Sequence, residues 1–141
     1  MGAKINFLRE YISNPGSIGA VAPSGRILAS RMLDGISLEN ATTVVELGPG
    51  TGAFTTEILQ RISSDAQFIL IEKNPAFLVG LRQRFENLEI IEGDAENLVH
   101  LLRPRGLDAV DVVVSGLPWA AFPEAVQQSI LSEVHDILAP K

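Results

Sequence analysis

The sequence has no cysteine and only two histidines, which excludes a disulfide framework and leaves few side chains able to bind a transition metal. No apolar run approaches the roughly 20 residues that a bilayer-spanning helix requires, and the first residues lack the apolar core of a secretory signal. Basic residues are scarce, because 11 Lys and Arg face 17 Asp and Glu for a net charge of -6. Such a charge disfavours a protein that binds the phosphate backbone of nucleic acid. These absences predict a soluble cytoplasmic protein without a bound metal.

What the sequence does contain is 46% hydrophobic residues in a chain of 141, enough for the core of one domain. No repeat, low-complexity tract or linker divides the chain, so residues 1–141 are expected to form a single domain. Residues 1–35 are expected to be helical, with helices at about 5–13 and 24–33. The first of these is amphipathic, because one helical stripe carries Ile5, Leu8, Tyr11 and Ile12.

From residue 42 onward, short apolar segments rich in β-branched residues alternate with segments of helical periodicity. Strands are expected at 42–47, 67–72, 88–91 and 109–115, and helices at about 54–62, 75–85, 95–102 and 123–138. Asn74 with Pro75 favours one helix start, and Pro123 favours another. This alternation predicts an α/β fold with a mostly parallel sheet of about four strands and helices on both faces.

A glycine-rich segment, Gly48-Pro49-Gly50-Thr51-Gly52, connects the first of these strands to a helix. Its glycines allow a tight turn and let backbone N–H groups approach a ligand. With the following alanine the segment also satisfies the dinucleotide pattern G-x-G-x-x-G/A, and Glu72 follows at the distance of a ribose-binding acid. A nicotinamide enzyme is therefore one interpretation. Two features argue against it: Glu46 precedes the glycines, and Gly93-Asp94-Ala95 follows the third strand.

The nine residues from Val44 to Gly52 resemble motif I of the class I S-adenosylmethionine-dependent methyltransferases, which have a seven-stranded Rossmann-like sheet. Three further segments fall where that family keeps its next motifs: Glu72, Asp94 and Gly116-Leu117-Pro118-Trp119. All of them lie at the C-terminal ends of strands, the edge where open α/β sheets bind ligands. The resemblance implies S-adenosylmethionine as cofactor and S-adenosylhomocysteine as its product.

By the same resemblance, eight residues are expected to bind the cofactor: Glu46, Gly48, Gly50, Gly52, Glu72, Asp94, Ala95 and Ser115. The glycines would contact the methionine part, and Glu46 would hold its aminoacyl end. Glu72 would accept hydrogen bonds from the ribose hydroxyls, and Asp94 would read the adenine amino group. Three plainer interpretations stay open: a solvated strand end for Glu72, a helix cap for Asp94, and a turn-stabilising acceptor for Glu46.

A longer resemblance, from Phe7-Leu8 through residues 19–24 to Trp119, concerns the methyl acceptor. The chain is similar over this length to bacterial phospholipid N-methyltransferases, which are relatives of the rRNA adenine dimethyltransferases. This implies methyl transfer to the amine of phosphatidylethanolamine-type lipids. In the rRNA enzymes the fourth motif begins with Asn, or Asp in related amino methyltransferases. Here that position is Gly116, which weakens the RNA interpretation.

The catalytic base is not identified by the sequence, although an alkylamine with a pKa of about 10 must lose a proton before it attacks. Acceptor-side candidates are Gly116, Leu117, Pro118, Trp119 and Tyr11. Besides lipid methylation, two functions stay open: an rRNA adenine N6-methyltransferase, and a truncated module that binds cofactor without turnover.

Two partners are expected, a membrane surface and a second copy of the chain. The first helix, with Lys4 and Arg9, could lie on the anionic inner face of a membrane or could simply pack on the domain. Strands five to seven of the family are absent from the sequence, so either the chain is truncated or a partner chain completes the sheet, because the strand at 110–115 would otherwise have an open, uncovered edge. A homo-oligomer that completes the sheet is therefore expected.

Overall fold

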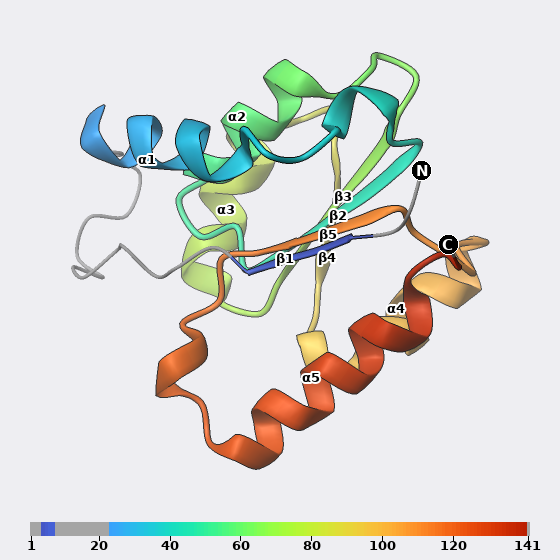
Figure 1. Cartoon of the computed structure of the whole chain (residues 1–141). Coiled ribbons are helices and arrows are strands. Elements are labelled where there is room, and N and C mark those ends of the chain that lie inside the picture. The colour runs from blue at the N-terminus through green and yellow to red at the C-terminus, as the bar shows by residue number, and fades with distance from the viewer. Residues whose placement is uncertain (1–3, 8–22, 141) are drawn as a thin grey trace.

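The computed structural model describes residues 4–7 and 23–140, with side chains described for residues 27 and 29–140. Its centre is a five-stranded sheet in the order β1-β5-β2-β3-β4, in which every pair of neighbours is parallel (Figure 1). The strands are β1 (Lys4–Phe7), β2 (Thr43–Leu47), β3 (Gln67–Glu72), β4 (Glu89–Glu92) and β5 (Val112–Ser115). The predicted parallel α/β sheet is confirmed, with one strand more than expected.

Helices cover both faces of the sheet, as predicted (Figure 1). One face carries α1 (Pro23–Leu33), α2 (Ala53–Arg61) and α3 (Pro75–Arg84), and the other carries α4 (Leu98–Leu102) and α5 (Glu124–Ile137). α3 begins where expected, because the side chain of Asn74 accepts a hydrogen bond from Ala76 N at 2.9 Å and Pro75 occupies the first turn. In the described part of the chain, no helix is both long and apolar enough to span a bilayer.

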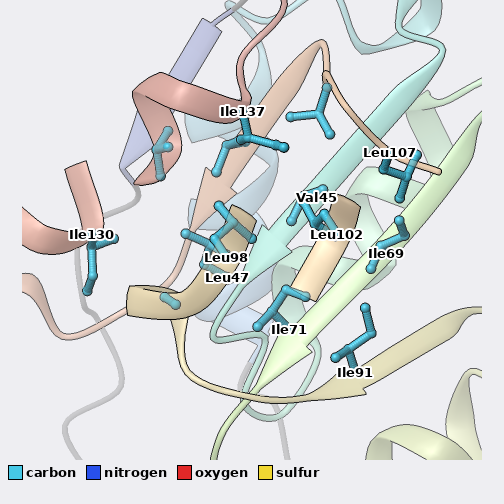
Figure 2. Packing of buried hydrophobic residues seen from close by; sticks show 14 residues of the cluster. Val45, Leu47, Ile69, Ile71, Ile91, Leu98, Leu102, Leu107, Ile130 and Ile137 are labelled. Carbon is cyan, nitrogen blue, oxygen red and sulfur yellow. The ribbon is translucent and has the colours of Figure 1, made fainter. Parts of the chain in front are cut away.

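Two apolar cores hold these layers together, one on each face of the sheet. Successive side chains of a strand point to opposite faces, so Val44 belongs to the core under α1 and α2 and Val45 to the core under α4 and α5. Figure 2 shows the second core, where Leu98 of α4 and Ile130 of α5 gather with Leu47 of β2. Each fully buried Leu or Ile contributes about 1.5–3 kcal/mol to stability. Because residues of β2, β3 and β5 are buried in both cores, packing holds these strands, and with them their C-terminal ends, in place.

The N-terminal segment corrects two expectations. The predicted helix at 5–13 is wrong for residues 5–7, because β1 pairs with β5 in the register Ile5↔Val113. Residues 8–13, which include Tyr11 and Arg9, lie outside the described residues. Pairing satisfies backbone N–H and C=O groups along the edge of β5, and this outweighs the helical periodicity of so short a segment. β5 thus lies between β1 and β2 and is not an edge strand. The expectation of a homo-oligomer rests on an open edge of β5; because that edge is paired, the oligomer stays a prediction.

Candidate active site

Four strand ends meet at one edge of the sheet. β2, β3, β4 and β5 are parallel, so the segments that follow them lie along the same edge. These segments are residues 48–52, 73–74, 93–94 and 116–117. The fold therefore brings together every motif that the sequence places directly after a strand.

The loop at 48–52 depends on left-handed backbone at three glycines, with φ of +66° at Gly48, +58° at Gly50 and +90° at Gly52. Residues with a side chain rarely adopt these angles. The neighbouring chain also comes close, because a Cβ on Gly48 would lie 2.6 Å from Leu117 Cδ2. All three glycines are thus needed for the turn, and Gly48 is also needed for its contact with the segment after β5.

Glu72 is buried at the end of β3, with 6% of its surface exposed. Its Oε1 accepts a hydrogen bond from Gly50 N at 3.0 Å, and its Oε2 accepts one from Asn74 N at 2.9 Å. The carboxylate therefore joins the glycine loop to the start of α3. The interpretation of Glu72 as a solvated strand end is wrong, because the side chain is buried and both oxygens are bonded.

Asp94 precedes a 3₁₀ turn, Ala95–Asn97, that leads into α4. Its Oδ1 accepts a hydrogen bond from Glu96 N at 2.9 Å, which confirms its role as a cap, and its Oδ2 lies 3.0 Å from Nζ of Lys73. The Glu96 N–H, together with the Lys73 ammonium group, holds the pKa of Asp94 below its usual range in spite of partial burial. At neutral pH this carboxylate is charged and accepts hydrogen bonds at the edge of the sheet.

Glu46, in β2, has none of its surface exposed. The hydroxyl of Thr55 in α2 donates to its Oε1 at 2.5 Å, while its Oε2 is buried and, among the described residues, has no hydrogen-bond partner. Burial raises the pKa of Glu46 to about 8, opposed by the Thr55 hydrogen bond and reinforced by the charge of Glu72. The interpretation as a turn-stabilising acceptor finds no support, since the donor belongs to the helix and not to the glycine loop.

A cavity of about 280 Å³ opens between the ends of β3 and β4 and the first turns of α5. Its polar side is formed by Glu72, Lys73, Asp94 and Glu96. Its apolar walls are formed by Ile71, Leu117, Phe122, Val126 and Ile130. Apolar walls with a few fixed polar groups are typical of sites for small molecules.

Four of the predicted cofactor residues line this cavity: Gly48, Glu72, Asp94 and Ala95. The lining does not include the other four, which are Glu46, Gly50, Gly52 and Ser115. Gly50 acts on the cavity through its bond to Glu72. Ser115 is buried and its Oγ accepts a hydrogen bond from Leu117 N at 3.3 Å, so its side chain shapes the segment after β5.

The acceptor-side candidates are divided in the same way. Leu117 lines the cavity, whereas Gly116, Pro118 and Trp119 adjoin it in the chain without lining it. Tyr11 lies outside the described residues, so its assignment stays a prediction.

Sequence reasoning missed the residues that reach the site from other elements. Phe122 and Val126 line the cavity only because α5 folds back across the sheet, and no local pattern indicates that crossing. Lys73 could have been found, because it directly follows Glu72 at the same strand end. Behind the glycine loop, the guanidinium group of Arg84 donates to the carbonyl oxygen of Thr51.

Comparison with known proteins identifies the chemistry that this arrangement serves. A family model described as a methyltransferase domain matches residues 44–141. Over 137 residues the chain is 39% identical to an ornithine lipid N-methyltransferase from Singulisphaera acidiphila. The aligned region covers 95% of this chain and 71% of that protein. The chain belongs to the class I S-adenosylmethionine-dependent methyltransferases. The family match also removes the nicotinamide interpretation.

Other relatives of this methyltransferase chain are more distant. It is 33% identical over 97 residues to a probable ribosomal RNA small subunit methyltransferase A from Methanosarcina mazei, covering 67% of the chain and 32% of that protein. Its fold matches the SAM-bound amino pentose methyltransferase CalS10 from Micromonospora echinaspora with a TM-score of 0.61 and 21% identity, covering 83% of the chain and 46% of that structure. It also matches the O-methyltransferase TomG from Streptomyces achromogenes, in complex with SAM, with a TM-score of 0.61 and 19% identity. This match covers 86% of the chain and 54% of that structure. The chain thus spans most of the ornithine lipid enzyme but only about a third to a half of these others.

The residues present fit the family's cofactor on two observations. The buried Oε2 of Glu46 has no hydrogen-bond partner among the described residues, which is unfavourable, and an α-ammonium group beside it would both fill that place and favour the ionised carboxylate. The glycine loop presents backbone without side chains beside a cavity that carries Glu72 and Asp94. Glu46 would therefore hold the aminoacyl end, and Glu72 and Asp94 the nucleoside.

Proposed function

We propose that the chain carries the cofactor-binding part of an N-methyltransferase whose acceptor is the primary amine of a membrane lipid, such as ornithine lipid or phosphatidylethanolamine. The observation that carries the proposal is the 39% identity to an ornithine lipid N-methyltransferase over 95% of the chain. The net charge of -6 supports a lipid amine over RNA, because RNA binding depends on Lys and Arg that neutralise phosphates.

The segment after β5 also supports an aliphatic amine. A Cβ on Gly116 would lie 3.1 Å from the carbonyl oxygen of Gly48, a tighter approach than real Cβ atoms usually make. There is little room here for the Asn or Asp side chain that the resemblance implies for enzymes acting on an adenine amino group. An aliphatic amine, once neutral, is already a good nucleophile and chiefly needs to be positioned.

When bound, S-adenosylmethionine supplies a methyl group on a sulfonium, so that the amine lone pair forms the N–C bond, the S–C bond breaks and a neutral thioether leaves. The chain's own contribution is to bind and orient. The amides of the glycine loop and the carboxylates of Glu72 and Asp94 would hold the donor at the edge of the sheet. The acceptor amine, with a pKa of about 10, is mostly protonated near neutrality and must lose a proton before it attacks.

Transfer of tritium-labelled methyl groups tests the proposal. The protein is incubated with labelled S-adenosylmethionine and, in separate reactions, with vesicles containing ornithine lipid, vesicles containing phosphatidylethanolamine, and rRNA. We expect label in a lipid fraction. Transfer should be lost in Glu72→Ala and kept in Glu92→Ala, whose exposed carboxylate ends the neighbouring strand.

Two outcomes would contradict the proposal. Label found in RNA and absent from both lipids would assign the chain to adenine methylation, in line with its weaker similarity to the rRNA enzymes. Saturable binding of S-adenosylhomocysteine without transfer to any acceptor would indicate a module that binds cofactor without turnover.

A further inference from the structure

The segment between β5 and α5, residues 116–123, forms part of the cavity wall although it contains no strand or long helix. Within this 116–123 loop lies one 3₁₀ turn, Trp119–Ala121, and its residues Leu117 and Phe122 line the cavity. Leu117 also lies against the glycine loop, since its Cδ2 is 2.6 Å from where a Cβ on Gly48 would be. The 116–123 loop therefore forms the part of the cavity wall that adjoins the glycine loop.

One side chain of α5 connects both ends of the turn. Gln127 Nε2 donates a hydrogen bond to the carbonyl oxygen of Trp119 at 3.0 Å and another to that of Phe122 at 3.1 Å. A primary amide has two N–H donors, so each one serves a different carbonyl. Gln127 lies between Val126 and Ile130, which line the same cavity. Its amide thus connects the loop to the helix that completes the wall.

The bonds within the turn do not make this connection. Ala121 N donates to Pro118 O at 3.0 Å, and Phe122 N donates to Trp119 O at 3.1 Å. Both bonds close the turn on itself, and where the chain enters α5 the N–H groups of Val126 and Gln127 donate to Pro123 O, so none of these bonds ties the turn itself to α5. The two bonds from the Gln127 side chain make that link, one at each end of the turn.

We propose that Gln127 is a positioning residue that holds the 116–123 loop over the cofactor cavity and so aligns the loop for methyl transfer. Its effect on catalysis rests on the proposed function, whereas its effect on the loop and on cofactor affinity does not. Gln127 acts through the two carbonyls that it binds and is not part of the cavity lining.

Two substitutions of similar length separate the hydrogen bonds from packing. Gln127→Met keeps the length of the side chain and removes both donors. Gln127→Glu keeps the shape and sets a carboxylate against two carbonyl oxygens. Gln128→Met is the matched control, because Gln128 is exposed in the same turn of α5.

Trp119 is the only tryptophan in the sequence, so its fluorescence reports on the loop. We expect Gln127→Met to increase acrylamide quenching of Trp119 and to weaken S-adenosylhomocysteine binding about fivefold, as for the loss of about one net hydrogen bond. The kcat of methyl transfer should fall further, about tenfold, because misalignment affects the reacting geometry more than binding. Gln127→Glu should also increase the quenching of Trp119 over that of the natural protein at the same pH. This increase should be larger at pH 8 than at pH 5.5. At the lower pH the introduced carboxyl can carry a proton and donate one hydrogen bond, which restores part of the connection.

Unchanged quenching and unchanged cofactor affinity in Gln127→Met would overturn the proposal, and so would an equal change in Gln128→Met. A lower unfolding temperature with normal quenching in the folded state would limit Gln127 to stabilising α5, and would also overturn it. Quenching and cofactor affinity need no methyl acceptor. If both respond as expected while lipid methylation is absent, the proposed function is contradicted and the positioning role is not.

Discussion

Two buried glutamates at the ends of neighbouring strands have opposite surroundings. Glu72, at the end of β3, accepts one backbone N–H at each carboxylate oxygen, from Gly50 and Asn74. Glu46, one residue before the end of β2, receives a single hydrogen bond from the Thr55 hydroxyl, and its second oxygen is unpartnered among the described residues. Backbone amides favour a buried charge, whereas burial with few donors disfavours it. For this reason the pKa of Glu46 rises to about 8.

The difference separates a residue that builds the site from one that receives a ligand. Glu72 holds the glycine loop against α3 through bonds that are already formed in the protein alone. Glu46 leaves a buried oxygen unpaired, which costs about 1–3 kcal/mol. A ligand ammonium group would remove that cost, so the two carboxyl groups should respond differently to substitution and to the cofactor.

The largest effect is expected when Glu46 is made permanently neutral. The folded protein holds a proton on Glu46 up to a pKa of about 8, against an ordinary value of 4.5. The stability contributed by this group is therefore full below pH 4.5 and is lost as the pH rises to about 8. A shift of this size corresponds to on the order of 5 kcal/mol. We expect Glu46→Gln to approach that gain over the natural protein at pH 8.5, with little difference near pH 5, as measured by urea unfolding without cofactor.

The matched control for this experiment is Glu92→Gln, because Glu92 is an exposed carboxylate at the end of β4. Its stability should follow that of the natural protein across the same pH range. If the stability difference between Glu46→Gln and the natural protein does not change with pH, then Glu46 is ionised in the folded protein and the comparison with Glu72 fails.

The second largest effect is expected when the amide-bonded carboxylate is removed. Glu72→Ala loses the acceptor of Gly50 N and Asn74 N and the group proposed to hold the ribose. Hydrogen bonds to a charged group contribute about 1.5–3 kcal/mol each, so we expect S-adenosylhomocysteine binding to weaken at least about 100-fold by calorimetric titration. Glu92→Ala should bind as the natural protein does. An affinity for Glu72→Ala within about threefold of the natural value, roughly 0.7 kcal/mol, would show that Glu72 only supports the loop.

The predictable part of the site consists of residues whose place is decided by their neighbours in sequence. The strand expected at 67–72 has those bounds in the structure, and Glu72 therefore reaches the predicted edge. Asn74 and Asp94 act as caps because a short polar side chain before a helical turn accepts its first free N–H. The glycine loop is recognisable because its conformation excludes side chains at Gly48, Gly50 and Gly52.

The rest depends on contacts between distant segments. Residues 5–7 have helical periodicity but form β1, because the edge of β5 offers them backbone partners. Phe122 and Gln127 take their places from the path of α5 across the sheet. The pKa of Glu46 depends on the Thr55 hydroxyl, the one donor that reaches it among the described residues, and that contact follows from how α2 packs on β2. Spacing in the sequence contains none of this information.

The smallest of the expected effects concerns protons released on cofactor binding. At pH 6 Glu46 is protonated in the protein alone, because its pKa is about 8, and an ammonium group beside it favours the ionised form. Binding of S-adenosylhomocysteine should therefore release about one proton, and the affinity should rise about 20-fold between pH 5.5 and pH 7. Calorimetry in two buffers of different ionisation enthalpy measures the number of protons. Glu46→Gln should release none in this range, because the amide that replaces the carboxyl group carries no titratable proton. Equal proton release from Glu46→Gln and the natural protein would assign the ammonium group to another acceptor.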